Sequence, residues 1–235
     1  MIKKYFELDK LNIDKFKYYL FYGENEGLKQ EIIERKFKNN FKNDIFHYDE
    51  SEILKNEKNF INEISSKSFF ENKKLFIISR STDKILSICD DILNSGDEEI
   101  TIIFISDKLE KRSKLRSLFE KDNKLICIPF YSDNYQTLSY IIKDFFKKIK
   151  IPISQEILNT TINRSNGDRK NLNNELIKIQ SYSKNKKTIT HEEILKLTNL
   201  SENYDYSELV DFCLAKNQRK TVDIINDNFR LNLSI

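Results

Sequence analysis

Five short strand-like runs separate helix-like segments before Pro129, and this alternation constrains the fold more than any other feature of the sequence. The runs lie at residues 17–22, 44–48, 75–78, 99–106 and 125–128. Unbroken apolar stretches such as LFII in the third run are typical of strands that are buried on both faces of a sheet. Strands that alternate with helices build a parallel sheet, so we expect an α/β domain whose last strand ends at Pro129.

Helical periodicity without strands follows that proline. Apolar residues recur at helical spacing over 137–148 and 168–182, and Thr190 with Glu193 forms a capping box for a later helix. Residues 206–231 have the pattern of a two-helix hairpin, which alone would bury little surface. The last part therefore looks incomplete, and the chain is either a fragment or a naturally short version. We expect three domains, at residues 1–134, 135–202 and 203–235.

Composition and charge limit the classes of function. The chain carries 40 Lys and Arg against 37 Asp and Glu, and a net charge of +3 is far from the basic balance of a protein that holds DNA alone. Its three cysteines have no paired spacing, which argues for a reducing compartment and against a disulfide framework or a zinc site. No signal-peptide pattern precedes the first strand and no apolar run approaches about 18 residues, so we expect a cytoplasmic protein without membrane contact.

The loop after the first predicted strand is where a phosphate-binding P-loop would lie, and it lacks the required residues. The pattern G-x-x-x-x-G-K-[ST] needs glycines for close backbone approach, a lysine for the phosphates and a hydroxyl for magnesium. Here the run is GENEGLKQ at residues 23–30: its second glycine comes one place early, Leu28 stands where a glycine is needed, and the Lys-Ser/Thr pair is missing. Glu24 and Glu26 would also repel phosphate. The loop is therefore either a degenerate P-loop or an ordinary strand–helix turn.

A second strand end lacks the chemistry of nucleotide hydrolysis as well. The run at 75–78 is followed by Ser79 and Arg80, whereas a nucleotide hydrolase places acidic magnesium ligands at this point. His47 has no ligand-like neighbours, so we interpret it as a structural histidine. We therefore expect no catalytic residue, no metal and no nucleotide cofactor.

Two further stretches are candidates for contact with other molecules. Phe69 and Phe70 lie between a predicted helix over 51–65 and a polar turn, where two large rings are either core or aromatic anchors offered to a partner. Residues 107–120 predict an amphipathic helix with a basic side, which is either a solvated face or a contact with nucleic acid or a neighbouring subunit. That side consists of Lys111, Arg112, Lys114 and Arg116.

In this order along one chain, these features resemble the delta subunit of the bacterial DNA polymerase III clamp loader. The matching segments are YLFYG at 19–23 with Gly27, SFFENKKL at 68–75, LEKRSKLR at 109–116, and GDR at 167–169 with Leu172, Glu175 and Leu176. Phe69 replaces the more usual leucine of the family's clamp-binding turn. Most of the family's longer C-terminal collar domain is absent from this sequence.

The resemblance implies an AAA+-like α/β domain with a degenerate P-loop, a helical lid and the start of a helical collar. It also implies that Ser68, Phe69 and Phe70 bind the sliding clamp (beta subunit) and favour its opened form for loading onto primed DNA, without ATP hydrolysis by this subunit. The implied partners are the clamp, the loader's ATPase and delta-prime subunits, and primer–template DNA in the assembled complex. The whole assembly is a DNA-directed DNA polymerase, a nucleotidyltransferase. Possible DNA or subunit contacts are Lys111, Arg112, Lys114, Arg116 and Arg169.

Three alternatives stay open on the sequence. An active AAA+ ATPase of the same loader would need the missing Lys-Thr pair. The delta-prime subunit would carry an arginine finger in a Ser-Arg-Cys run and a zinc-binding cysteine cluster, and the sequence has neither. A stand-alone DNA-binding helical module would use residues 111–116 and 184–187 and would bind DNA with a steep salt dependence.

Overall fold

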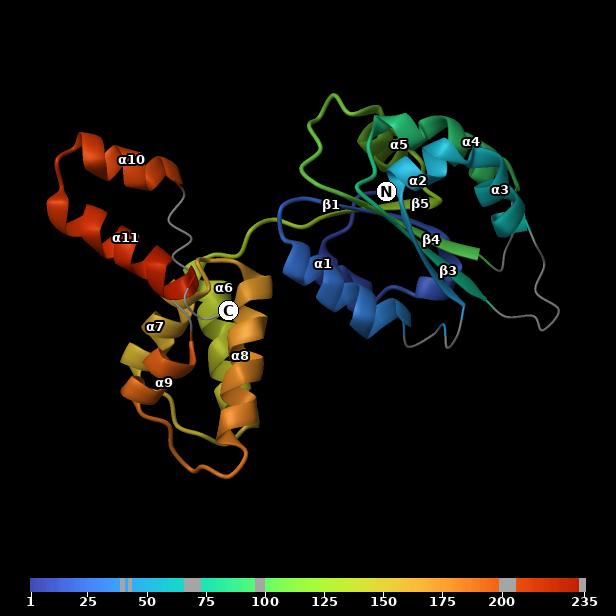
Figure 1. Cartoon of the computed structure of the whole chain (residues 1–235). Helices are drawn as coiled ribbons and strands as arrows, with labels where there is room; N and C mark the ends of the chain where they lie inside the picture. The colour runs from blue at the N-terminus through green and yellow to red at the C-terminus, as the bar shows by residue number, and fades with distance from the viewer. Residues whose placement is uncertain (39–40, 42–43, 66–72, 96–99, 199–205, 233–235) are drawn as a thin grey trace. The chain divides into compact units, whose positions relative to one another are not determined.

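A computed structural model describes residues 1–38, 41, 44–65, 73–95, 100–198 and 206–232 of the chain (Figure 1). Its contacts divide the chain into two compact units. Met1–Ile141 with Gly167–Asn174 form the first, which we call the sheet unit, and Ile142–Asn166 with Glu175–Ile235 form the second, the helical unit. The division into three domains at 1–134, 135–202 and 203–235 stays a prediction.

The sheet unit contains five parallel strands. They are β1 (Tyr18–Tyr22), β2 (Ile45–Asp49), β3 (Lys74–Ser79), β4 (Ile100–Ser106) and β5 (Leu125–Pro129). Their order in the sheet is β2-β3-β4-β1-β5, and Leu20 of β1 lies in register with Phe104 of β4 and Cys127 of β5. Each strand coincides closely with one of the five predicted runs, so the prediction of a parallel α/β sheet is confirmed.

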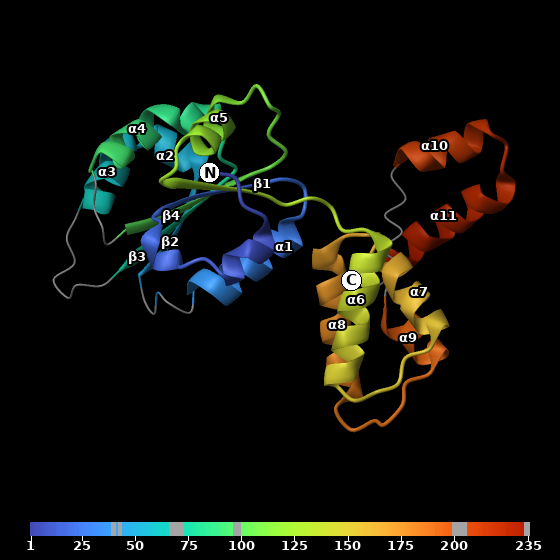
Figure 2. The ribbon, with the colours of Figure 1, turned by 180° about the vertical axis from the view of Figure 1, so that it is seen from behind.

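Helices cover both faces of this sheet, as Figures 1 and 2 show from opposite sides. One face carries α2 (Glu50–Lys55), α3 (Glu57–Ser65), the short η5 (Asp83–Ile85), α4 (Leu86–Ser95) and α5 (Lys114–Lys121). The other carries the 3-10 segments η1 (Tyr5–Asp9) and η2 (Ile13–Lys15), α1 (Glu26–Ile32) and the π-helical η3 (Ile33–Phe37). Burial on both faces accounts for the mainly apolar character of β1, β3, β4 and β5.

Strand β1 contributes to both hydrophobic cores. Leu20 and Tyr22 belong to the core on the α2–α5 face, whereas Tyr19 and Phe21 belong to the core on the α1 face. The Phe21 ring is fully buried, and burial of such a side chain is worth about 1.5–3 kcal/mol. Because the strand is held from both sides, the loop that follows it at Gly23 starts from a fixed position.

Two predicted helices differ from the observed ones. The helix predicted over 51–65 is two helices, because Asn56 between them adopts φ −145° and ψ 48°. The helix predicted over 107–120 begins only at Lys114. Its start is set by Asp83, whose carboxylate accepts hydrogen bonds from the Ser113 hydroxyl at 2.7 Å and from the Lys114 amide at 3.0 Å. The prediction that residues 107–113 are helical was therefore wrong.

The remaining helices are α6 (Tyr135–Lys148), α7 (Gln155–Arg164), α8 (Arg169–Ser183), α9 (His191–Leu197), α10 (Tyr206–Leu214) and α11 (Gln218–Asn232). Thr190 and Glu193 form the predicted capping box of α9. His191 joins α9 to α7, with Nε2 2.8 Å from the Thr160 hydroxyl and Nδ1 3.0 Å from Glu156. Among the described residues, no helix combines the length and the apolar character needed to cross a membrane.

Candidate functional site

The loop between β1 and α1 lies against the backbone that follows β5. Gly23 has φ +128°, and a Cβ at this position would lie 2.1 Å from the Phe130 carbonyl oxygen. Only glycine combines this backbone conformation with so close an approach. Asn25 then caps α1, because its Oδ1 accepts a hydrogen bond from the Leu28 amide at 3.0 Å. The loop therefore has a defined conformation that depends on Gly23.

The backbone amides of this loop are bonded to other atoms of the protein. The Gly23 amide donates to the Asp107 carbonyl at 3.2 Å, and the Asn25 amide donates to the Phe130 carbonyl at 3.3 Å. The Leu28 amide is used by the cap already described. A phosphate-binding loop instead aims such N–H groups at the ligand. In this conformation the loop offers a phosphate few of the donors it would need.

The charged side chains of the loop also disfavour phosphate. Glu24 accepts hydrogen bonds from the Ser132 hydroxyl at 3.0 Å and from Lys108 at 3.3 Å, and these bonds lower the pKa of Glu24. The Lys29 side chain is 1% exposed, and its ammonium donates to the Ser106 carbonyl at 2.8 Å and pairs with Glu26. The one lysine of the loop thus links α1 to the end of β4.

Arg169, which the sequence singled out as a possible contact residue, is buried in an ion-pair network. Its Nε and Nη2 donate to the two carboxylate oxygens of Asp133, each at 2.7 Å, and its Nη1 lies 3.1 Å from Glu31. Burial lowers the pKa of Arg169, but the bonds to Asp133 and the charges of Asp133 and Glu31 outweigh it and raise the pKa overall. The Asn25 side chain donates to the same Asp133 at 2.8 Å. This network ties the loop, α1 and the start of α8 together within the sheet unit.

Sequence reasoning missed Asp133, Asn25 and Glu31 as members of this network. Asn25 carried a signal, because asparagine directly before a helix is a common cap. Asp133 and Glu31 carried none, since each meets Arg169 only through the fold.

Strand β3 ends at Ser79, and Arg80 follows it. Arg80 adopts φ +56° and its exposed guanidinium pairs with Asp49 at the end of β2. The bonds from Ser51 and from Arg80 lower the pKa of Asp49 to about 2. In the part of the chain that the structure describes, no cluster of three or more His, Cys, Asp or Glu side chains could hold a metal ion.

The basic candidates of residues 111–116 fall into two groups. Arg116 is held within the protein, with Nε 2.7 Å from Glu120, Nη1 3.0 Å from the Leu109 carbonyl and its guanidinium 4.9 Å from the Tyr22 ring centre. Lys111, Arg112 and Lys114 are exposed at the surface, Arg112 beside Glu110 at 2.6 Å. We retain these three as candidates for contact with DNA or another subunit, and assign Arg116 and Arg169 to the sheet unit's own packing.

The predicted clamp-binding residues Ser68, Phe69 and Phe70 lie outside the described residues. The elements on either side of them are well anchored. Phe60 and Ile64 of α3 are buried in the core on the α2–α5 face, and the Phe60 ring packs edge-on against Phe76 of β3 at 6.0 Å.

The sheet order and the strand–loop–helix start define the class of protein: it has an AAA+-like α/β domain, as predicted. The structure is similar to the Bacillus subtilis DNA clamp loader delta protein (YqeN), with a TM-score of 0.56 and 17% identity over 97% of this chain and 71% of that one. It is also similar to the Thermotoga maritima RuvB Holliday junction branch migration motor, with a TM-score of 0.54 and 12% identity over 84% of this chain and 68% of that one. At such identities the likeness concerns the fold alone.

The family model described as DNA polymerase III, delta subunit, matches residues 19–128. These residues include most of the sheet, the loop at Gly23 and the segment 66–72. This match over residues 19–128 agrees with the resemblance seen in the sequence. A search of curated proteins gave no match.

Proposed function

We propose that this chain acts in a bacterial clamp loader as a delta-type subunit that binds and opens the sliding clamp and does not hydrolyse ATP itself. Its partners are the clamp, the ATPase and delta-prime subunits, and primer–template DNA in the assembled complex, and it works in the cytoplasm. The match of residues 19–128 to the family model of the DNA polymerase III delta subunit supports this proposal.

The proposed absence of ATP hydrolysis rests on how the groups of the Gly23–Lys29 loop are already bonded. Its amides bond to Asp107 and Phe130, and its lysine bonds to Ser106 and Glu26. A triphosphate would have to replace all of these contacts and to approach two carboxylates. Energy for loading then has to come from neighbouring subunits.

Clamp opening needs no chemistry in this subunit. A protein that binds the opened ring better than the closed ring shifts the equilibrium by the difference in binding free energy. In our proposal, Phe69 and Phe70 fill an apolar pocket of the clamp and Ser68 precedes them in the binding turn. Two aromatic anchors are sufficient for this role, since few residues carry most of the free energy of an interface.

The double variant Phe69→Ala/Phe70→Ala tests the clamp-binding part. We expect its affinity for the purified clamp to fall by at least about 2 kcal/mol, roughly 30-fold, with an unchanged melting temperature. The matched control is Tyr131→Ala/Tyr140→Ala, which removes two rings that are 75% and 72% exposed elsewhere and should keep clamp affinity. Unfolding of the double variant would show that the rings are core, and unchanged clamp affinity would refute the binding role.

Calorimetry with Mg-ATP tests the proposal that this subunit does not use ATP itself. The isolated chain should show no binding at about 1 mM nucleotide, whereas a competent nucleotide site would be at least half saturated there. Lys29→Met should lower the melting temperature and leave the calorimetric trace flat. Saturable ATP binding by the wild-type chain that Lys29→Met abolishes would overturn the proposal and favour an ATPase subunit.

A further inference from the structure

The two edges of the sheet differ in how their backbone groups are used. At the β5 edge, Ile2 bridges Cys127, the Lys3 amide donates to the Cys127 carbonyl at 2.9 Å and the Cys127 amide donates to the Met1 carbonyl at 3.0 Å. At the other edge, β2 pairs with β3 and with no other strand that the structure describes. An unpaired edge of this kind is a template for another strand.

The register shows which groups face outward at the β2 edge. The Leu75 amide of β3 donates to the Asp44 carbonyl at 2.8 Å, so the main chain of residue 44 faces β3. Because main-chain groups alternate in direction along a strand, those of Ile45 and His47 face away from β3, toward the open edge. These two residues together present two N–H donors and two carbonyl acceptors.

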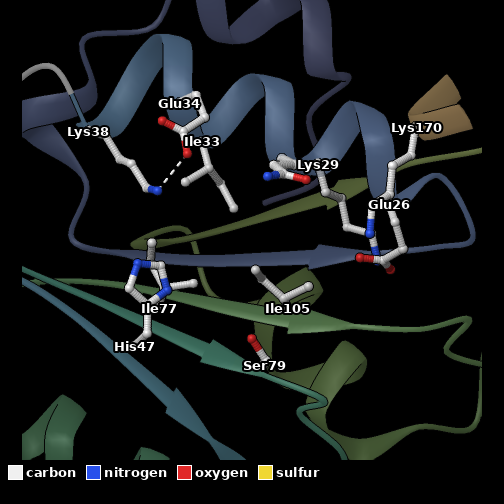
Figure 3. A pocket seen from close by; sticks show the side chains of 11 residues that line it. Glu26, Lys29, Ile33, Glu34, Lys38, His47, Ile77, Ser79, Ile105 and Lys170 are labelled. Atoms are coloured by element: carbon white, nitrogen blue, oxygen red, sulfur yellow. Dashed lines mark hydrogen bonds and ion pairs between the residues drawn. The ribbon is translucent and has the colours of Figure 1, made fainter. Parts of the chain in front are cut away.

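A cavity of about 260 Å³ lies beside this edge, between α1 with η3 above and the strands β2, β3 and β4 below (Figure 3). Its apolar lining comes from Ile33, Ile77 and Ile105, and its wall on the β2 side is the His47 side chain. Ser79 lies at the end of β3 in the same lining. His47 therefore belongs to both features, with its main chain on the open edge and its imidazole in the cavity wall.

The charges around the cavity favour an apolar occupant. Lys29 pairs with Glu26, and Lys38 pairs with Glu34, so four of the charged groups in the lining neutralise one another. Burial and the nearby charge of Lys38, partly offset by Glu34, lower the pKa of His47, which disfavours its charged form. Lys170 is the remaining charged residue of the lining. The volume suits one large side chain rather than a drug-sized ligand, whose pockets span roughly 300–1,000 Å³.

We propose that the open edge of β2 and the adjoining cavity form a docking site for an extended segment of a partner protein. The segment would pair with the main chain of Ile45 and His47 as an added strand and place one large aliphatic or aromatic side chain against Ile77 and Ile105. Strand addition with a side-chain pocket is an established mode of peptide recognition. This site is separate from Ser68, Phe69 and Phe70 and goes beyond the proposed clamp-binding role.

Selection from a random-peptide display library on the full chain tests the proposal. The selected peptides should share one large apolar residue within a stretch of strand-forming residues. Ser79→Phe fills the cavity and His47→Pro removes an outward N–H, which an edge strand tolerates, so each should weaken binding of the selected peptide at least about tenfold. Ser79→Thr leaves the cavity open and His47→Thr keeps the outward N–H, so each should weaken peptide binding less than Ser79→Phe or His47→Pro does, and all four variants should keep their affinity for the clamp.

Several results would overturn the docking site. These are a library that yields no peptide above background, full affinity in both Ser79→Phe and His47→Pro, or a dimer in sedimentation that His47→Pro dissolves, since a second copy would then occupy the edge. If a variant does not melt cooperatively, the selected peptide is given a photoreactive group at its apolar position and cross-linked to the wild-type chain. Adducts on β2, β3 or β4 beside the cavity support the proposal, and adducts elsewhere refute it.

Discussion

At the scale of single residues, two cations near the β1 loop are used to hold the protein together. Lys29 bonds to the end of β4, and Arg169 bonds to Asp133 and Glu31. Both side chains are almost completely buried, at 1% and 6% exposure. A buried cation is tolerated only with partners that match it, so these residues are committed to the fold in the described conformation.

The Arg169–Asp133 pair gives a prediction about stability. Arg169→Met leaves the Asp133 carboxylate buried without its cation, so we expect the free energy of unfolding to fall by about 3–5 kcal/mol in urea titrations. Arg112→Met removes a partner of Glu110 from a pair that is 87% and 65% exposed, and should cost at most about 1 kcal/mol. Equal losses in the two variants would mean that the buried network does not stabilise the sheet unit.

The sequence predicted part of this residue-level picture. The missing Lys-Ser/Thr pair and the acidic residues Glu24 and Glu26 predicted that the run departs from a phosphate-binding loop, and the contacts of the loop are compatible with this prediction. The pairing of Arg169 could not be predicted, because Asp133 lies 36 positions away and stands in no motif. A sequence motif shows which phosphate-binding residues a loop lacks. The contacts that the loop makes instead depend on distant residues that the fold brings close.

At the scale of elements, the strands can be predicted from the local sequence, whereas the start of α5 depends on a distant residue. Four of the five strands followed from their apolar runs, because a strand buried on both faces is apolar throughout, whereas the edge strand β2 is half-buried and contains the exposed His47. The start of α5 did not, because it is fixed by Asp83, about 30 positions earlier, which bonds the amides of Lys114 and Leu115. Apolar periodicity predicts a helix wherever apolar residues recur at helical spacing. The real helix can start several residues later, where a side chain of another element caps it.

Two glycines with positive φ among the described residues, Gly23 and Gly167, provide a matched test of the β1 loop. Gly23→Ala would force a Cβ to within 2.1 Å of the Phe130 carbonyl oxygen, whereas Gly167, at φ +71°, has open space around its Cβ position. We expect Gly167→Ala to cost about 1–2 kcal/mol and Gly23→Ala to cost at least about 2 kcal/mol more. Chemical denaturation of the two variants measures the difference. A smaller loss in Gly23→Ala would show that the loop can move away from Phe130 at little cost.

At the scale of the whole molecule, the near-neutral charge disfavours tight DNA binding by this chain alone. The chain has an AAA+-like sheet domain and a net charge of only +3. Exposed Lys111, Arg112 and Lys114 form a small basic group at the start of α5. Three such charges give weak nonspecific affinity by themselves, and under the proposed function they would add to the DNA contacts of neighbouring subunits.

DNA titrations over a range of salt separate this interpretation from a stand-alone DNA-binding module. We expect the isolated chain to bind duplex DNA no more tightly than about 10 μM at physiological salt, within the nonspecific range. In the assembled loader, Lys111→Ala/Arg112→Ala/Lys114→Ala should reduce the slope of log affinity against log salt by about one unit for each residue that contacts a phosphate.

Lys184→Ala/Lys187→Ala is the control, because these exposed lysines belong to the other basic stretch and should leave the slope unchanged. Tight, salt-sensitive binding by the isolated chain that the control variant weakens would instead support a DNA-binding module centred on residues 184–187.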